Sequence, residues 1–245
     1  MKNRFTLRIA LSAMLLLGSI SFGFAQDNEA TAPKKEHKKI SGGFGYFSPG
    51  YGLVSNEALN TYVGSSGSSF EDNGITLGGG GVLMIKSIML GGEGSSFLDQ
   101  SGNFGNMDLT FHSGSGKFSL GYVVYGRKGL LVYPKLGIGG YNYELTMVNK
   151  DAVASVDSAF TGAFTGTSLT RKGTFVSAGV GLDWMPGFDE TAGSGLVFGF
   201  EAGYNLSINE NGWESFGTKL SGGPALLPDG IYFKLHIGFA GWNRQ

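Results

Sequence analysis

The chain contains no cysteine, which excludes disulfide bonds, thiolate metal sites and a cysteine nucleophile. Charge is also scarce. The chain has 18 basic and 19 acidic residues, and only 27 of these 37 charged residues fall between positions 41 and 245. That density is about half of the roughly 25–35% that a soluble surface usually carries. After the N-terminal region, no run approaches the roughly 18 apolar residues that a membrane-spanning helix needs. The net charge of −1 gives no reason to expect a nucleic-acid partner.

Glycine, in contrast, is abundant. The chain has 44 glycines among 245 residues, against a usual share of roughly 7%. They show no collagen-like period and fall inside segments of alternating polarity. In such segments, we expect glycine to relieve crowding on a curved barrel wall.

The N-terminus has the features of a secretory signal peptide. Lys2 and Arg4 precede an apolar run, Ile9 to Ile20, that is too short for a membrane-spanning helix; a membrane anchor is the alternative. Gly23 and Ala25 are small residues at the positions that predict cleavage after Ala25. We therefore predict a signal peptide over residues 1–25, a flexible charged leader over 26–40 and a barrel domain over 41–245.

The stretch from Ile231 to Trp242 has a strict two-residue period, with apolar residues at odd positions and mostly polar or small ones at even positions. About ten residues is also the length that a tilted β-strand needs to cross a membrane. Similar patterns predict an all-β fold: an antiparallel, up-and-down transmembrane β-barrel of about eight strands, with ten as an alternative count. The predicted strands are 42–54, 74–85, 88 to as far as 111, 116–125, 130–147, 174–184, 195–207 and 231–242.

The connections between these strands alternate between long and short, as they do in bacterial outer-membrane barrels with long extracellular loops and short periplasmic turns. The pattern places both chain ends at the periplasmic side, and it predicts that the last strand pairs with residues 42–54 to close the barrel. A change of phase near Gly139 and Gly140 predicts a β-bulge. Residues 56–63 have the spacing of a short helix within the first long loop.

The low charge density favours a barrel with its apolar face outside, in lipid. An eight-stranded barrel is just wide enough for side chains to fill it, so charges inside it must pair. We expect Glu201 to lie near Lys234 or His236, because their strands are neighbours. The predicted lumen charges are Glu93, Lys117, Lys135, Asp183, Glu201, Lys234 and His236. The predicted aromatic girdle at the periplasmic interface is Tyr125, Tyr133, Trp184 and Trp242.

Several motifs, including Gly78 to Gly81, Leu90 to Gly94, Tyr133 to Gly140 and Tyr232 to Gly238, together with the alternating strands, resemble the small outer-membrane β-barrel proteins of Gram-negative bacteria. The resemblance implies a place in the outer membrane, contact with its lipid and insertion by the outer-membrane assembly machinery. Many such barrels end on an aromatic residue, whereas here Trp242 is followed by three further residues.

No motif for catalysis or for a cofactor or metal is found. The three histidines, His37, His112 and His236, show no metal-ligand spacing. His112 followed by Ser113 suggests a hydrolase, but no motif supplies an acid partner or an oxyanion hole. We expect a non-enzymatic barrel whose long loops meet an extracellular partner or which stiffens the envelope. A narrow channel or small-ligand carrier, a lipid-modifying enzyme and a soluble periplasmic barrel stay open as alternatives.

Overall fold

A computed structural model describes residues 40–53, 56–64, 70–151, 166–186 and 192–244. The predicted signal peptide and nearly all of the predicted leader lie outside these residues. In the described part of the chain, no helix is long and apolar enough to cross a membrane.

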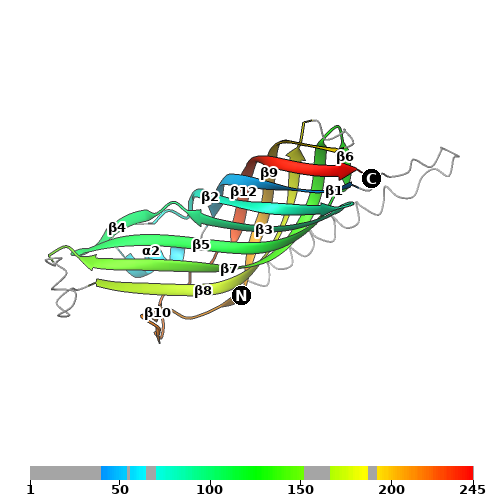
Figure 1. Ribbon diagram of the computed structural model, residues 1–245. Helices are drawn as coiled ribbons and strands as arrows, with labels where there is room; N and C mark the ends of the chain where they lie inside the picture. The colour runs from blue at the N-terminus through cyan, green and yellow to red at the C-terminus, as the bar shows by residue number, and fades with distance from the viewer. Residues whose placement is uncertain (1–39, 54–55, 65–69, 152–165, 187–191, 245) are drawn as a thin grey trace. The chain divides into compact units, whose positions relative to one another are not determined.

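Eight strands of the described residues form a closed antiparallel barrel, as the sequence predicts (Figure 1). Neighbours in sequence are neighbours in the sheet, and the first strand pairs with the last, with Tyr46 opposite Gly238. The predicted closure by the terminal strand is therefore confirmed. The barrel strands are β1 (Ile40–Leu53), β2 (Asn73–Ile85), β3 (Ile88–Phe97), β5 (Met107–Tyr122), β7 (Leu130–Asn149), β8 (Gly166–Trp184), β9 (Ala192–Glu210) and β12 (Gly230–Arg244).

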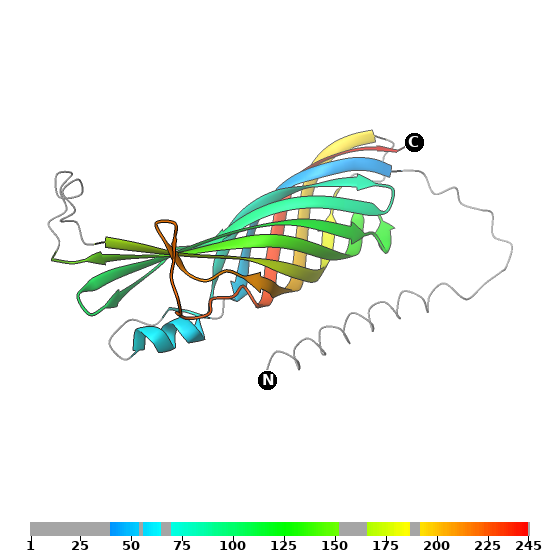
Figure 2. The same ribbon diagram turned by 90° about the horizontal axis from the view of Figure 1, so that it is seen from below.

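Four short strands lie outside the eight-stranded ring. They are β4 (Gln100–Phe104), β6 (Tyr125–Arg127), β10 (Glu214–Ser215) and β11 (Thr218–Lys219). The first long loop contains the predicted helix, α2 (Glu57–Val63), which Figure 2 shows at the same end as the tips of β4 and β5. The last strand includes Asn243 and Arg244, paired with Ser41 and Ile40, so these tail residues simply lengthen it.

The outer face of the barrel is apolar over a continuous band. On β12 the odd residues from Ile231 to Phe239 are exposed, and Phe239 is 73% accessible. Phe118 on β5 is 78% accessible. The even residues of β12, among them Tyr232 and His236, are buried in the lumen. Apolar side chains therefore face outward and polar ones inward, which is the arrangement of a membrane barrel and the reverse of a soluble one.

This polarity reverses along β7. From Leu130 to Ile138 the outward residues are apolar, whereas from Asn142 to Thr146 they are polar. Over the second stretch the inward residues become apolar and buried, namely Tyr141, Tyr143 and Leu145. The strand thus changes its surroundings while its inward and outward positions keep their phase.

The bulge predicted near Gly139 and Gly140 is wrong, because the pairing of β7 with both neighbours runs through these residues without a shift. The reversal of polarity produced the apparent change of phase. The register shift that the structure does contain lies between Thr174 and Phe175, in the pairing of β8 with β9.

The same reversal explains an error on the third and fourth predicted strands. Leu109 and Phe111 on β5 are buried in the interior, whereas Phe118 and Leu120 on the same strand face outward. The alternation alone therefore extends the predicted third strand as far as Phe111, which is wrong. In the structure β3 ends at Phe97, β4 forms a hairpin with the start of β5, and β5 runs unbroken to Tyr122.

Candidate functional site

The lumen at mid-height is filled by one cluster of charged and phenolic side chains. Every barrel strand except β2 contributes a member, and all members sit at inward positions that alternate with the outward apolar ones. We call this set the lumen network. It comprises Tyr46 on β1, Glu93 on β3, Lys117 on β5, Tyr133 and Lys135 on β7, Asp183 on β8, Glu201 on β9, and Tyr232, Lys234 and His236 on β12.

Glu201 is fully buried and lies at the centre of the lumen network. One carboxylate oxygen accepts hydrogen bonds from Lys117 Nζ at 3.2 Å and from Tyr232 Oη at 2.7 Å. The other accepts a bond from Lys135 Nζ at 2.5 Å and lies 3.5 Å from His236 Nε2. Charge-assisted bonds of this kind are what a carboxylate removed from water requires.

Glu93 forms the second centre, on the side of the network that faces the long loops. Lys117 Nζ lies 3.3 Å and Lys135 Nζ 3.6 Å from its carboxylate oxygens, so both lysines bridge the two glutamates. Lys234 pairs with Glu93, and Tyr46 Oη donates a hydrogen bond to the Glu93 carboxylate at 3.2 Å. Lys234 is opposite Glu201 in the strand register but reaches across the lumen to Glu93 instead.

Asp183 and His236 complete the network toward the short-turn end. Tyr133 Oη donates to Asp183 at 2.6 Å, and His236 Nδ1 lies 3.0 Å from the other carboxylate oxygen. The His236 ring stacks on Tyr46 with centroids 4.2 Å apart. Three carboxylates face three lysine ammonium groups, so the formal charges cancel when His236 is neutral.

Glycine makes room for these long side chains. A Cβ on Gly181 would lie 2.3 Å from the ring of Tyr133, its partner in the register, and one on Gly203 would lie 2.6 Å from the ring of Tyr232. A Cβ on Gly199 would lie 1.8 Å from an Asp183 carboxylate oxygen. The abundant glycine of this chain therefore does more than relax the curvature, since it clears the space that the network occupies.

Below the network, toward the short turns, the lumen is closed by packed apolar side chains. Asp183 and His236 are therefore separated from the short-turn end by a layer without charged groups. This apolar plug shares Tyr46 and Tyr133 with the lumen network and further comprises Phe44, Val82, Met84, Met89, Leu131, Met185, Val197, Ala240 and Trp242.

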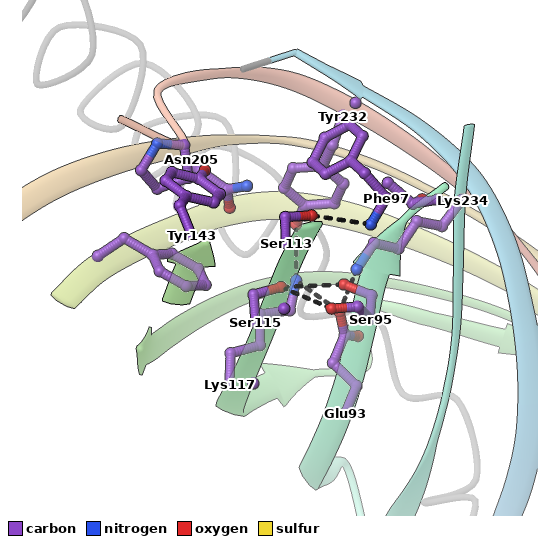
Figure 3. Close-up of a pocket in the computed structure, with 16 residues that line it drawn as sticks. Glu93, Ser95, Phe97, Ser113, Ser115, Lys117, Tyr143, Asn205, Tyr232 and Lys234 are labelled. Carbon is purple, nitrogen blue, oxygen red and sulfur yellow. Dashed lines mark hydrogen bonds and ion pairs between the residues drawn. The ribbon is translucent and has the colours of Figure 1, made fainter. Parts of the chain in front are cut away.

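Above the network lies a small cavity with both polar and apolar lining residues (Figure 3). Its volume is about 50 Å³, and Ser95, Ser113 and Ser115 line it together with Lys117 and Lys234. Figure 3 shows the serines and the network side chains turned toward one another, and the two hydroxyls of Ser95 and Ser115 lie 3.1 Å apart. Since a water needs about 10–15 Å³ of such space, the cavity holds only a few waters.

A second apolar cluster caps the outer end of the lumen. It joins the inner faces of β5, β7 and β8 to α2 and to the connection between β9 and β12. Trp213 in that connection donates its indole N–H to Pro224 O at 2.8 Å, and its ring lies near the Arg171 guanidinium. The cluster comprises Leu59, Phe70, Leu109, Phe111, Tyr141, Tyr143, Leu145, Phe175, Trp213 and Leu226.

The structure brings all seven predicted lumen charges into this one network, and Glu201 lies beside His236. The phenolic members Tyr46, Tyr133 and Tyr232 are not among the predicted lumen residues. The signal was present for two of them, because Tyr232 and Tyr133 share the parity of Lys234 and Lys135 on their own strands.

The predicted aromatic girdle is wrong for two of its four residues. Tyr125 and Trp184 are exposed on the outer surface. Tyr133 and Trp242 are turned into the lumen, where Tyr133 bonds to Asp183 and Trp242 packs over Gly193. All four residues lie near the short-turn ends of their strands, but whether a residue is odd or even in the strand decides which face it occupies.

The hydrolase hypothesis meets a geometric obstacle. His112 and Ser113 are consecutive on β5, so their side chains lie on opposite faces of the sheet. His112 Nδ1 lies 2.6 Å from Asp99 Oδ1 at the exposed outer surface, whereas Ser113 lines the interior cavity and accepts a bond from Phe97 N. His236 is enclosed among the network residues. Within the described ranges, no group of three or more histidine or acidic side chains is placed to hold a metal ion.

Comparison with known proteins gives a likeness of fold. No protein-family model and no curated protein matches the chain. Ail, the attachment invasion locus protein of Yersinia pestis, matches in its complex with the heparin analogue sucrose octasulfate, at 12% identity and a TM-score of 0.40, over 84% of this chain and 98% of Ail. The outer membrane protein OprG of Pseudomonas aeruginosa matches at 13% identity and a TM-score of 0.41, over 85% of this chain and 97% of OprG. The outer membrane protease OmpT of Escherichia coli matches at 11% identity and a TM-score of 0.29, over 89% of this chain and 99% of OmpT. These matches agree with the resemblance stated from the sequence, and the closed eight-stranded barrel itself is shown by the strand pairing.

Proposed function

We propose that this protein is a non-enzymatic outer-membrane barrel with a closed lumen, which projects a rigid sheet outside the cell to stiffen the envelope or to bind an extracellular partner. The observation that carries the proposal is the combination of an apolar outer band with a lumen filled across its section by ion pairs and packed side chains. In this proposal the outer-membrane assembly machinery inserts the barrel, and a cleaved signal peptide directs its export.

The length of the apolar band matches one membrane crossing. Leu130 to Ile138 on β7 spans about nine residues, within the roughly 9–11 that a tilted transmembrane strand requires. From Asn142 to Thr146, β7 has polar outward residues and an apolar interior, which is the arrangement of a soluble barrel wall. This part of β7 therefore lies beyond the lipid, together with the adjoining parts of β5 and β8.

The projecting sheet is well braced for a surface role. At its far end Asn106 bonds to Asn149 and Asp151, which ties the turn between β4 and β5 to the end of β7. On the opposite edge Arg171 bonds to Glu210 and to Pro224 O, which ties β8 to the end of β9 and the loop after it. Such cross-links favour a fixed surface over a set of mobile loops.

Single-cysteine labelling tests the placement, and the absence of native cysteine makes it clean. Ser101→Cys lies on β4 at the projecting end, and Ser87→Cys lies in the short turn after β2. In intact cells, a membrane-impermeant maleimide should label the first and spare the second, while both should react after lysis. Labelling of Ser87→Cys in intact cells, or recovery of a soluble protein without a heat-modifiable band in the outer-membrane fraction, would overturn the proposal.

A narrow channel or small-ligand carrier is the second candidate, and the small cavity beside Lys117 and Lys234 favours it. The cavity is far smaller than the roughly 300–1,000 Å³ of ordinary ligand pockets, and the apolar plug separates it from the short-turn end. Measurement of ion conductance by the purified protein separates the two candidates.

A further inference from the structure

Three cationic residues project from two adjoining turns at the short-turn end. Lys86 lies in the turn between β2 and β3. Arg127 ends the short strand β6, and Lys128 lies in the turn between β6 and β7. The turns are side by side, because Val123 N donates to Ser87 O at 2.8 Å. All three cationic side chains are exposed, and we call them the basic turn cluster.

Two of these residues adopt a backbone conformation that favours glycine. The φ angles of Lys86 and Lys128 are 58° and 52°, in the left-handed region that side chains with a Cβ rarely occupy. A chain with 44 glycines uses lysine at both turn positions. Glycine would fit both turn positions without strain, so the backbone conformation gives no reason for a lysine there.

Among the described residues, the structure shows no acidic partner for the cluster. In the part of the chain that the structure describes, none of the three cations forms an ion pair. The carboxylate at this end of the described residues, Asp183, is fully buried and bonded to Tyr133. With respect to the described residues, the positive charge of the cluster is therefore free to meet an outside anion.

The surface beside the cluster is apolar and aromatic. Ile85, Ile88 and Tyr122 are exposed on the outer face, and Ile88 is opposite Tyr122 in the register of β3 and β5. Tyr125 is exposed on β6, the strand that ends at Arg127. Cations that border an exposed apolar band next to tyrosine match the two parts of a lipid, a charged headgroup above acyl chains.

We propose that the basic turn cluster binds the phosphate of an anionic phospholipid in the leaflet that surrounds the short-turn end, with the acyl chains along Ile85, Ile88 and Tyr122. The inference rests on the proposed membrane placement of the barrel and adds a lipid class to it. A soluble anion would use the cations alone, whereas the adjoining apolar residues serve only a ligand that carries hydrocarbon.

Spin-labelled lipids test this site. The full-length protein is reconstituted in phosphatidylcholine bilayers that contain a small amount of spin-labelled phosphatidylglycerol or spin-labelled phosphatidylcholine, and the fraction of lipid immobilised at the barrel gives their relative association. We expect phosphatidylglycerol to be favoured by about fivefold or more, which is the effect of at least one Lys or Arg near an anionic surface. Substitution of Lys86→Gln, Arg127→Gln and Lys128→Gln together should bring the ratio close to one.

A matched control removes three cations from the opposite end, through Lys150→Gln, Lys172→Gln and Lys219→Gln, and should keep the preference. Should the first triple variant fail to give a heat-modifiable band, the wild-type preference must still fall when salt is raised toward 1 M. Equal association of both lipids with the wild type, a preference unchanged in the folded cluster variant, or its loss in the control would each refute the site. Absence of any immobilised lipid would instead refute the membrane barrel itself.

Discussion

Replacement of Glu201 by glutamine removes one charge from the centre of the lumen network and leaves its volume almost unchanged. The amide oxygen can still accept from Tyr232 at 2.7 Å. Lys135 Nζ lies 2.5 Å from a Glu201 carboxylate oxygen in the wild type, and the substitution removes this ion pair, its shortest. Lys117 and Lys135 keep Glu93, at 3.3 and 3.6 Å, but Glu93 then serves all three lysines, because Asp183 pairs with His236 instead.

The cost follows from this imbalance. Removal of one partner from a buried ion pair usually destabilises a protein by roughly 3–5 kcal/mol, because the remaining charge is left without compensation. The surviving contacts of the two lysines to Glu93 place Glu201→Gln at the lower end, about 3 kcal/mol. Addition of Lys135→Met removes the surplus positive charge, so the double variant should be more stable than Glu201→Gln alone.

Urea unfolding of the protein in phospholipid vesicles, followed by tryptophan fluorescence, measures these differences. The matched control is Glu144→Gln, at an outward position of β7 where the carboxylate is only partly buried and accepts a bond from Ser168 Oγ. It should cost no more than about 1 kcal/mol. The account of the network is refuted if Glu201→Gln and Glu144→Gln lose similar, small amounts of stability.

Three further outcomes are expected. Gly181→Ala should destabilise the barrel by about 1–3 kcal/mol, because its Cβ would meet a tyrosine ring, whereas Gly241→Ala, with nothing within 4 Å, should unfold like the wild type in the same assay. Phe118→Arg should impair insertion, with a cost of roughly 2–4 kcal/mol, whereas Thr146→Arg on the polar stretch of β7 should give a normal heat-modifiable band. In single-tryptophan variants, brominated lipid should quench Trp184 strongly and the other two tryptophans weakly; equal quenching of all three would contradict the orientation of the strands.

The eight-stranded barrel and its inward charges could be predicted because both follow from a two-residue period. On β12 the alternation of Ile231, Phe233 and Leu235 with Lys234 and His236 assigns each side chain to a face without knowledge of any other strand. The partners of those charges depend on reach across the lumen, which strand order alone does not give. Lys234 is opposite Glu201 but pairs with Glu93.

The ends of the strands could not be predicted from alternation. A two-residue period assigns faces correctly only where the surroundings of each face stay the same along the strand. On β7, Tyr143 and Leu145 are inward and apolar, whereas Lys135 is inward and charged. The same face changes its polarity where the barrel leaves the lipid and encloses an apolar core of its own. A sequence that reverses in this manner resembles a bulge or a break, as the errors near Gly139 and before Phe111 show.

The central claim is a transmembrane barrel whose lumen is closed, and single-channel recording in planar bilayers tests it most directly. The purified, folded protein should add no stable conductance steps, because the lumen network and the apolar plug fill the section of the barrel. Heat-modifiable protein should be verified in the same preparation. Large, stable open steps from protein in that state would contradict the claim.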